Sequence, residues 1–254
     1  MKRIVGAMFA LTLVGCQTAH LAGVSTPGRW EGPNVYELPR FRWSPGRVVV
    51  MRAACTHDQG VQESVSRQTA VRKDASGLVE VVSEIDGKEY GRFYVNEAGR
   101  VVHVVVADDV KEILGDDPMA RFGALGDWAF QPLERNRPFS FQLPMVRLLG
   151  PGVGEKIPGL DKVMVDGRFE YLGQTVFNGV HAAGYWMSLG ARFRPEGAQV
   201  DLRGEGLSYS DTASGLALHY RWTLRMSMSA PGKPRETFQM DCRSTVDKSA
   251  SSGL

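Results

Sequence analysis

The clearest pattern in the chain is a strict alternation of apolar and polar residues between positions 216 and 228. The large apolar residues are Leu216, Leu218, Tyr220, Trp222, Leu224, Met226 and Met228. The residues that alternate with them are Ala217, His219, Arg221, Thr223, Arg225 and Ser227. A period of two is that of a β-strand, whose successive side chains point to opposite faces. This stretch therefore predicts a long strand with one buried face and one wet face.

Shorter runs with the same period fill most of the remaining chain. In the first half they lie near 47–55, 61–73, 78–85, 89–95 and 101–106, and in the second near 163–171, 180–193, 200–202 and 238–242. Turn residues separate them, and Asn178-Gly179 is the strongest two-residue hairpin signal. We predict a mainly β fold, an antiparallel meander of about ten strands. Long strands with one apolar face must bury that face, so the sheet should close into a barrel or curl on itself.

Residues 108–160 break the alternation. Asp108 can cap a short helix that ends at Gly115, and 119–130 has a pattern that favours another helical turn or two. Prolines at 132, 138 and 144 exclude a long helix. We expect a mixed, partly helical insertion. It would divide a single β domain, 46–247, into halves at 46–107 and 161–247.

The N-terminus has the features of a secretory signal. A charged start at Lys2 and Arg3 precedes an apolar run, 4–13, that is too short to cross a bilayer. Leu13-Val14-Gly15-Cys16 resembles the lipobox of bacterial lipoproteins, which predicts a signal peptide over 1–15. The resemblance implies that Cys16 carries fatty acyl chains such as palmitate, and Gln17 implies an outer-membrane address facing the periplasm. The alternative is an ordinary cysteine beside a conventional cleavage site.

Two further segments are expected to lie outside the folded domain. Residues 16–45 are rich in proline and glycine and predict a tether between the lipid anchor and the domain. Residues 248–254 predict a frayed tail.

The chain has three cysteines, and lipidation of Cys16 leaves Cys55 and Cys242. An even pair in an exported protein predicts a disulfide. Both residues lie on apolar faces, one on the first predicted strand and one on the last. The bridge would then join the two edges of a closed sheet.

Charge and motif searches exclude several function classes. The formal net charge is +2, and Lys2 and Arg3 leave with the signal, so nothing in the charge indicates nucleic acid as a partner. The chain has no Gly-x-Ser-x-Gly elbow, and 150–156 lacks the ending of a phosphate loop. His57 and Asp58 are adjacent, so their side chains should point apart. We predict no catalytic residue, no metal site and no cofactor, and therefore a protein that is not an enzyme.

Turn chemistry gives a second resemblance. Residues 173–179, Gly204-Glu205-Gly206 and 211–215 are similar to the turns of uncharacterised bacterial lipoprotein domains built from repeated hairpins, over about 162–230. The predicted architecture also resembles the lipoprotein-localisation carriers, whose half-open β barrel holds acyl chains against a helical lid. Insertion 108–149 would be the lid.

Two hypotheses follow for a lipid-anchored protein on the periplasmic face of the outer membrane. In the first, the apolar face from Leu216 to Met228 binds a lipid or another apolar ligand. In the second, the protein has a structural or assembly role and docks another envelope protein. An anchored enzyme is the third, and it would need a polar cleft with converging titratable groups.

Overall fold

The computed structural model describes residues 30–58, 60–108, 111, 131–145, 162–194, 198–229 and 231–253. The N-terminal strands of its main sheet are β2 (Val48–His57), β3 (Gly60–Lys73), β4 (Val79–Ile85), β5 (Lys88–Val95) and β6 (Val101–Val106). The C-terminal strands are β8 (Phe139–Pro144), β9 (Met164–Phe177), β10 (Val180–Phe193), β11 (Gln199–Asp211), β12 (Ala217–Ser229) and β13 (Glu236–Val246). Strands β1 (Val35–Tyr36) and β7 (Leu133–Glu134) form a separate pair.

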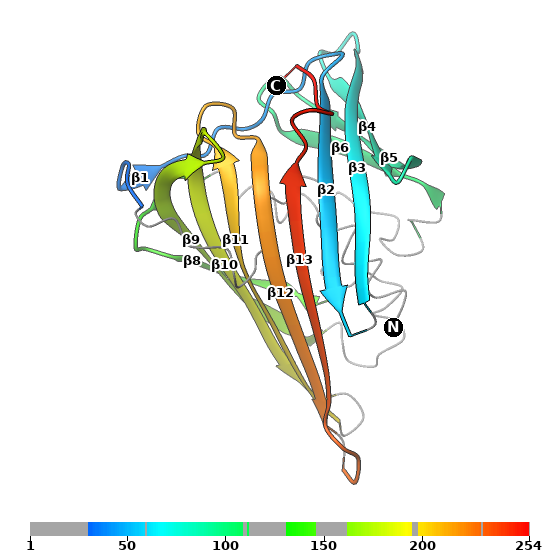
Figure 1. Cartoon of the computed structure of the whole chain (residues 1–254), viewed down its shortest axis with the longest axis vertical. Helices are drawn as coiled ribbons and strands as arrows, with labels where there is room; N and C mark the ends of the chain where they lie inside the picture. Colours follow the sequence, from blue (N-terminus) through cyan, green and yellow to red (C-terminus); the bar gives the residue numbers. More distant parts are fainter. Residues whose placement is uncertain are drawn as a thin grey trace.

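The main sheet is two antiparallel meanders joined side by side. Its 11 strands run in the order β6-β5-β4-β3-β2-β13-β12-β11-β10-β9-β8. Strand β2 pairs with β13, so the seam between the N-terminal and C-terminal halves lies inside the sheet. Strands β6 and β8 are its edges and do not pair with each other. The mainly β meander is confirmed, and of the two closures expected the curled, open sheet is the one observed (Figure 1).

Two predicted hairpin turns have the backbone geometry that their residues favour. Asn178 and Gly179 have φ values of 48° and 76°, and Asp86 and Gly87 have 50° and 79°. Positive φ at both central residues gives the turn a twist that matches the flanking strands. These turns fix the registers of β9 with β10 and of β4 with β5.

Strand β8 differs from the sequence prediction, which places Phe139–Pro144 inside a mixed insertion. Pro138 directly precedes the strand and Pro144 is its last residue. Neither proline interrupts the ladder, because β8 is an edge strand and pairs on one side with β9.

At the start of the insertion, Asp108 and Lys111 are helical, and the Lys111 N–H donates to the Ala107 carbonyl (3.0 Å). The remaining predicted helical positions lie outside the described residues.

The second half of the predicted tether packs against the domain. The side chain of Leu38 is 4% exposed and that of Phe41 is 9% exposed. Trp30 lies over Gly184, where a Cβ atom would collide with the indole ring. Leu38 and Phe41 are buried and Trp30, Tyr36 and Trp43 are partly buried, so these side chains attach the segment to the domain. Residues 1–29, which include the predicted signal, Cys16 and the first half of the tether, lie outside the described residues.

The C-terminal tail is also attached, which differs from the frayed end expected. Ser252 and Val48 exchange two backbone hydrogen bonds, at 3.0 and 2.9 Å. The Ser251 hydroxyl accepts a hydrogen bond from the Val50 N–H (2.9 Å). The Asp247 carboxylate accepts bonds from Ser249 (2.6 Å to its hydroxyl) and Arg52 (2.7 Å). Local capping by Asp247 turns the chain back onto β2.

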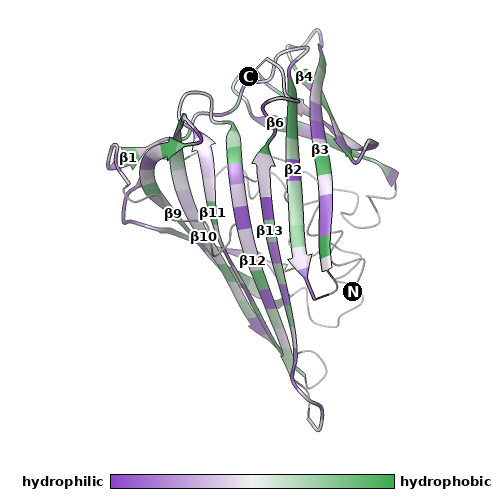
Figure 2. Cartoon of the chain, in the orientation of Figure 1, coloured by the Kyte–Doolittle hydropathy of each residue, from purple (hydrophilic) through white to green (hydrophobic). Residues whose placement is uncertain are grey.

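Hydrophobic and hydrophilic residues alternate along long strands such as β12 (Figure 2), which places them on opposite faces of the sheet. Register pairing places the even-numbered residues of β12 on the same face as Cys242 and Cys55. That face carries the main apolar cluster, which extends from β8 to β2 and includes Leu38, Leu133 and Met145 from outside the sheet strands (β7 and loops). We call it the inner face, and the opposite one the outer face.

Candidate functional site

The upper part of the inner face, near the start of β12, is a filled core. Tyr36 stacks on Tyr171 and Phe169 on Tyr185, with ring centroids 5.3 and 5.4 Å apart. Burial raises the pKa of the Tyr36 hydroxyl to about 12. The Trp222 ring lies across Gly204, where a Cβ would collide with it. A glycine inside a strand here permits the close approach of an aromatic ring.

The residues predicted to bind a ligand are distributed unevenly between core and surface. Five are between 4% and 9% exposed: Leu216, Leu218, Tyr220, Trp222 and Leu224. Leu216 and Leu218 pack with Phe41 in a smaller cluster, apart from the other three. Met226 is partly buried and Met228 is 40% exposed. A ligand could therefore contact the end of this row more readily than its beginning.

Half-buried apolar side chains surround Met226 at the lower end of the inner face. We call this set the lower apolar group: Phe141, Leu189, Ala191, Phe193, Met226 and Phe238. Met226 is in register with Leu202 on one side and Phe238 on the other. Sequence alternation places Leu189 and Phe193 on one face of β10, but it gives no signal that β8 adds Phe141.

The predicted disulfide between Cys55 and Cys242 is confirmed. The two cysteines are direct register partners on β2 and β13, with Cα atoms 4.0 Å apart. They lie on the inner face at the seam between the two halves. The bridge therefore joins neighbouring strands within the sheet, and the expectation that it joins the two edges is wrong.

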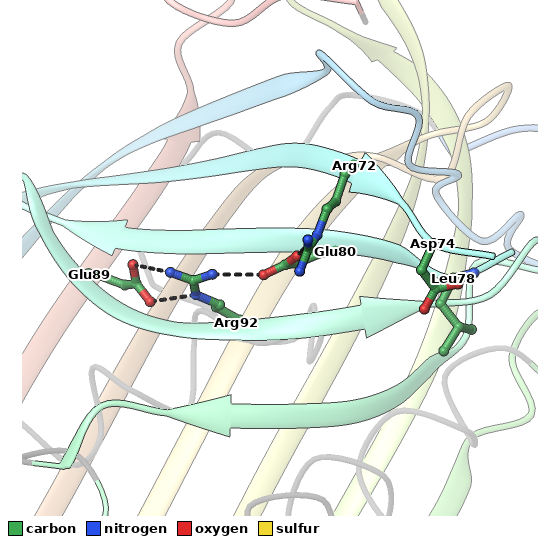
Figure 3. Close-up of polar contacts among 6 residues, drawn as sticks. All are labelled: Arg72, Asp74, Leu78, Glu80, Glu89 and Arg92. Atoms are coloured by element: carbon green, nitrogen blue, oxygen red, sulfur yellow. Dashed lines mark hydrogen bonds and ion pairs between the residues drawn. The ribbon is translucent and has the colours of Figure 1, made fainter. Parts of the chain in front are cut away.

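The outer face of the N-terminal half carries an alternating chain of charges (Figure 3). Glu80 accepts from Arg72 (2.5 Å) and from Arg92 (2.8 Å), and Arg92 also bonds Glu89 (2.8 Å). The Glu80 side chain is 4% exposed. The hydrogen bond from Arg92 and then that from Arg72 lower the pKa of Glu80 against the effect of burial. Each charge in this network has a partner of opposite sign.

The outer face of the C-terminal half contains a groove of about 990 Å³ with both polar and apolar lining. The groove crosses β8 to β12. It is deepest over Ser188 and Gly190, because these small residues of β10 lie between longer side chains on β9 and β11. Arg203 and Arg225 are direct register partners across β11 and β12 at one side. We call this hollow the outer groove. Its lining residues include Asp166, Arg168, Ser188, Arg203, Glu205, Thr223 and Arg225.

A buried histidine lies further up the outer side of β12. The His219 side chain stacks on Phe177 with ring centroids 5.3 Å apart, and its Nδ1 lies 2.6 Å from the Thr245 hydroxyl. His219 is 8% exposed, and its Nε2 has no hydrogen-bond partner among the described residues. Burial, reinforced by Arg221 and Arg243, lowers its pKa to about 4. The ring is therefore neutral at pH 7. His57 and Asp58, the adjacent pair of the sequence analysis, lie at the end of β2, where His57 is in register with Met240, whereas His219 is in register with Thr245.

Within the described parts of the chain, no three His, Cys, Asp or Glu residues are grouped so that they could hold a metal ion. The same residues include no helix with the length and hydrophobicity needed to cross a bilayer.

No protein-family model matches the sequence. No curated protein matches it either. Among solved structures, the chain is similar to the hypothetical lipoprotein YmcC from Escherichia coli (K12), with 10% identity and a TM-score of 0.29, over 85% of this chain and 90% of that one. It is also similar to a putative outer membrane lipoprotein-sorting protein domain from Vibrio parahaemolyticus, with 10% identity and a TM-score of 0.20, over 80% and 84%. At these TM-scores neither likeness contributes to the assignment of function.

Proposed function

We propose that this chain is a non-enzymatic lipoprotein, anchored through Cys16 at the periplasmic face of the outer membrane, that binds an acyl chain or similar apolar ligand. The ligand would lie on the inner face, against the lower apolar group. The lipobox and the apolar face of residues 216–228 support the proposal from sequence.

The observation that carries it is the partial exposure of the lower apolar group. Phe193, Met226 and Phe238 share the inner face with a core whose upper residues are almost completely buried, yet they are only half-buried. Contiguous apolar surface on a soluble domain indicates an interaction site. Methionine suits such a site because its flexible side chain adapts to chains of different shape.

The first test is native mass spectrometry of the full chain carrying Cys16→Ala, expressed in the periplasm with its disulfide intact. We expect a stoichiometric apolar molecule that solvent extraction releases, or a lipid adduct after incubation with phosphatidylethanolamine and phosphatidylglycerol. Met226→Lys should abolish the adduct, because it places a charge on the apolar face.

The matched control is Thr237→Lys, which adds the same charge at an exposed position of β13. This variant should bind as the unmodified chain does. A ligand-free mass under all conditions would contradict the proposal and favour the second hypothesis, a lipoprotein that docks another envelope protein. Equal loss in both variants would also contradict it.

A further inference from the structure

Two arginines of the outer groove, Arg203 and Arg225, face each other across neighbouring strands. This arrangement of like charges in the β11–β12 register destabilises a sheet. Arg225 donates to the uncharged amide of Gln239 (3.1 Å). Arg203 forms no ion pair with any residue that the structure describes. The neighbouring Asp201 bonds Arg192 (2.5 Å) and interacts with Arg203 only through its longer-range charge.

The same sheet shows how such arginines are otherwise accommodated. On the outer face of the N-terminal half, Arg72 and Arg92 both bond the buried carboxylate of Glu80. No carboxylate of the described residues bonds both Arg203 and Arg225, and both arginines border the hollow. Guanidinium groups are preferred donors to phosphate and carboxylate oxygens.

We propose that the outer groove binds a phosphate group through Arg203 and Arg225. The hollow over Ser188 and Gly190 leaves room for the rest of a larger polar molecule. Glu205 is in register with both Ser188 and Thr223, so it offers an acceptor for hydroxyl groups of that molecule. Arg168, which bonds Glu170 (3.3 Å), lies on the opposite side of the hollow.

Arg203 and Arg225 alternate along their strands with inner-face residues such as Leu202 and Met226, so the two arginines lie on the face opposite the proposed acyl site. Phe141 and Leu189 of the lower apolar group also border the hollow. The phosphate could belong to a lipid head group or to a soluble molecule. Both sources present the same group to the arginines, and the experiment below separates them.

The test uses the full Cys16→Ala chain with three probes: inorganic phosphate, vesicles containing phosphatidylglycerol and vesicles of phosphatidylcholine. Calorimetry measures phosphate binding, and flotation measures vesicle binding. We expect the double variant Arg203→Gln/Arg225→Gln to lose at least tenfold in affinity for phosphate or for the phosphatidylglycerol vesicles. Loss toward phosphate alone indicates a soluble ligand, and loss toward the vesicles alone indicates a head group.

The matched control is Arg192→Gln, which removes an arginine from the same face outside the groove. It should bind within twofold of the unmodified chain, although it breaks an ion pair. The double variant should also melt at an unchanged or higher temperature, because it removes a like-charge contact. The proposal is overturned if neither phosphate nor the phosphatidylglycerol vesicles bind, or if the double variant binds them normally. It is also overturned if the control loses as much, or if the double variant melts at a lower temperature.

Discussion

The two halves of the sheet have the same meander but use it differently. In the N-terminal half, β2 and β3 beside the seam have 10 and 14 residues, but β4, β5 and β6 have only 6 to 8. The outer face of this half carries a charge network in which every member is paired. In the C-terminal half, β9 to β13 are between 11 and 14 residues long. Their inner face is broad and partly exposed at one end, and their outer face contains arginines that face each other. The N-terminal half therefore has the features of a structural element, whereas both of the sites proposed above lie in the C-terminal half.

The largest effect is expected from breaking the bond that joins the halves. Replacing Cys55 and Cys242 with alanine should lower the free energy of unfolding by about 2–5 kcal/mol, because the disulfide restricts the unfolded chain across a long loop. The sequence separation is 187 residues. Urea unfolding monitored by circular dichroism measures the loss.

Hydrogen exchange of the same variant sharpens the comparison. We expect β4 to β6 to lose protection before β10 to β12, because their apolar cluster is smaller. A single, unchanged transition in the variant would show that the seam is held by strand pairing alone.

A comparable loss is expected at the centre of the C-terminal core. Trp222→Ala should cost about 3–5 kcal/mol, since it empties a large volume from the inner face. Gly204→Ala should cost about 1–3 kcal/mol by forcing the indole ring to move. The two effects should be non-additive, with Gly204→Ala nearly neutral once Trp222 is absent. The control is Gly190→Ala, where the nearest heavy atom to an added Cβ is the Leu202 carbonyl oxygen at 3.9 Å.

His219 should make the C-terminal half sensitive to acid. Its folded pKa of about 4 lies below the ordinary value of 6.5, so unfolding takes up a proton between these values. Its contribution to stability is complete above pH 6.5 and is lost as the pH falls toward 4, by at most about 3 kcal/mol. Urea unfolding at pH 7.5 and pH 4.5 measures this. In His219→Gln the additional loss should disappear, and an identical pH dependence in the variant would contradict the assignment.

Sequence patterns predicted the long strands well because period-two alternation and positive-φ turn residues are local signals. Trp222 and the Asn178-Gly179 turn illustrate this. The pairing of Cys55 with Cys242 could be predicted from the number of cysteines. The position of the disulfide in the sheet could not be predicted, because no local sequence signal indicates that β2 pairs with β13. Strand β8 was missed since flanking prolines argue against a strand unless it is known to be an edge. The outer groove depends on which residues of β9, β10 and β11 come into register, and alternation within one strand does not give register.

The smallest effects compare the charges of the two outer faces directly. Glu80→Gln should cost about 1–2 kcal/mol, because it leaves Arg72 and Arg92 without their shared carboxylate while both remain partly hydrated. The hydrogen bond from Arg92 lowers the pKa of Glu80, so this contribution is present above the ordinary carboxyl pKa and is lost as the pH falls through the lowered value. Arg203→Gln should instead be neutral or slightly stabilising, since it removes repulsion from Arg225. Unfolding in low and high salt tests both, because salt screens attraction and repulsion alike and should bring the two variants closer together. If Arg203→Gln lowers the free energy of unfolding as much as Glu80→Gln does, the arginines of the C-terminal half stabilise the fold. The contrast between the two outer faces would then be wrong.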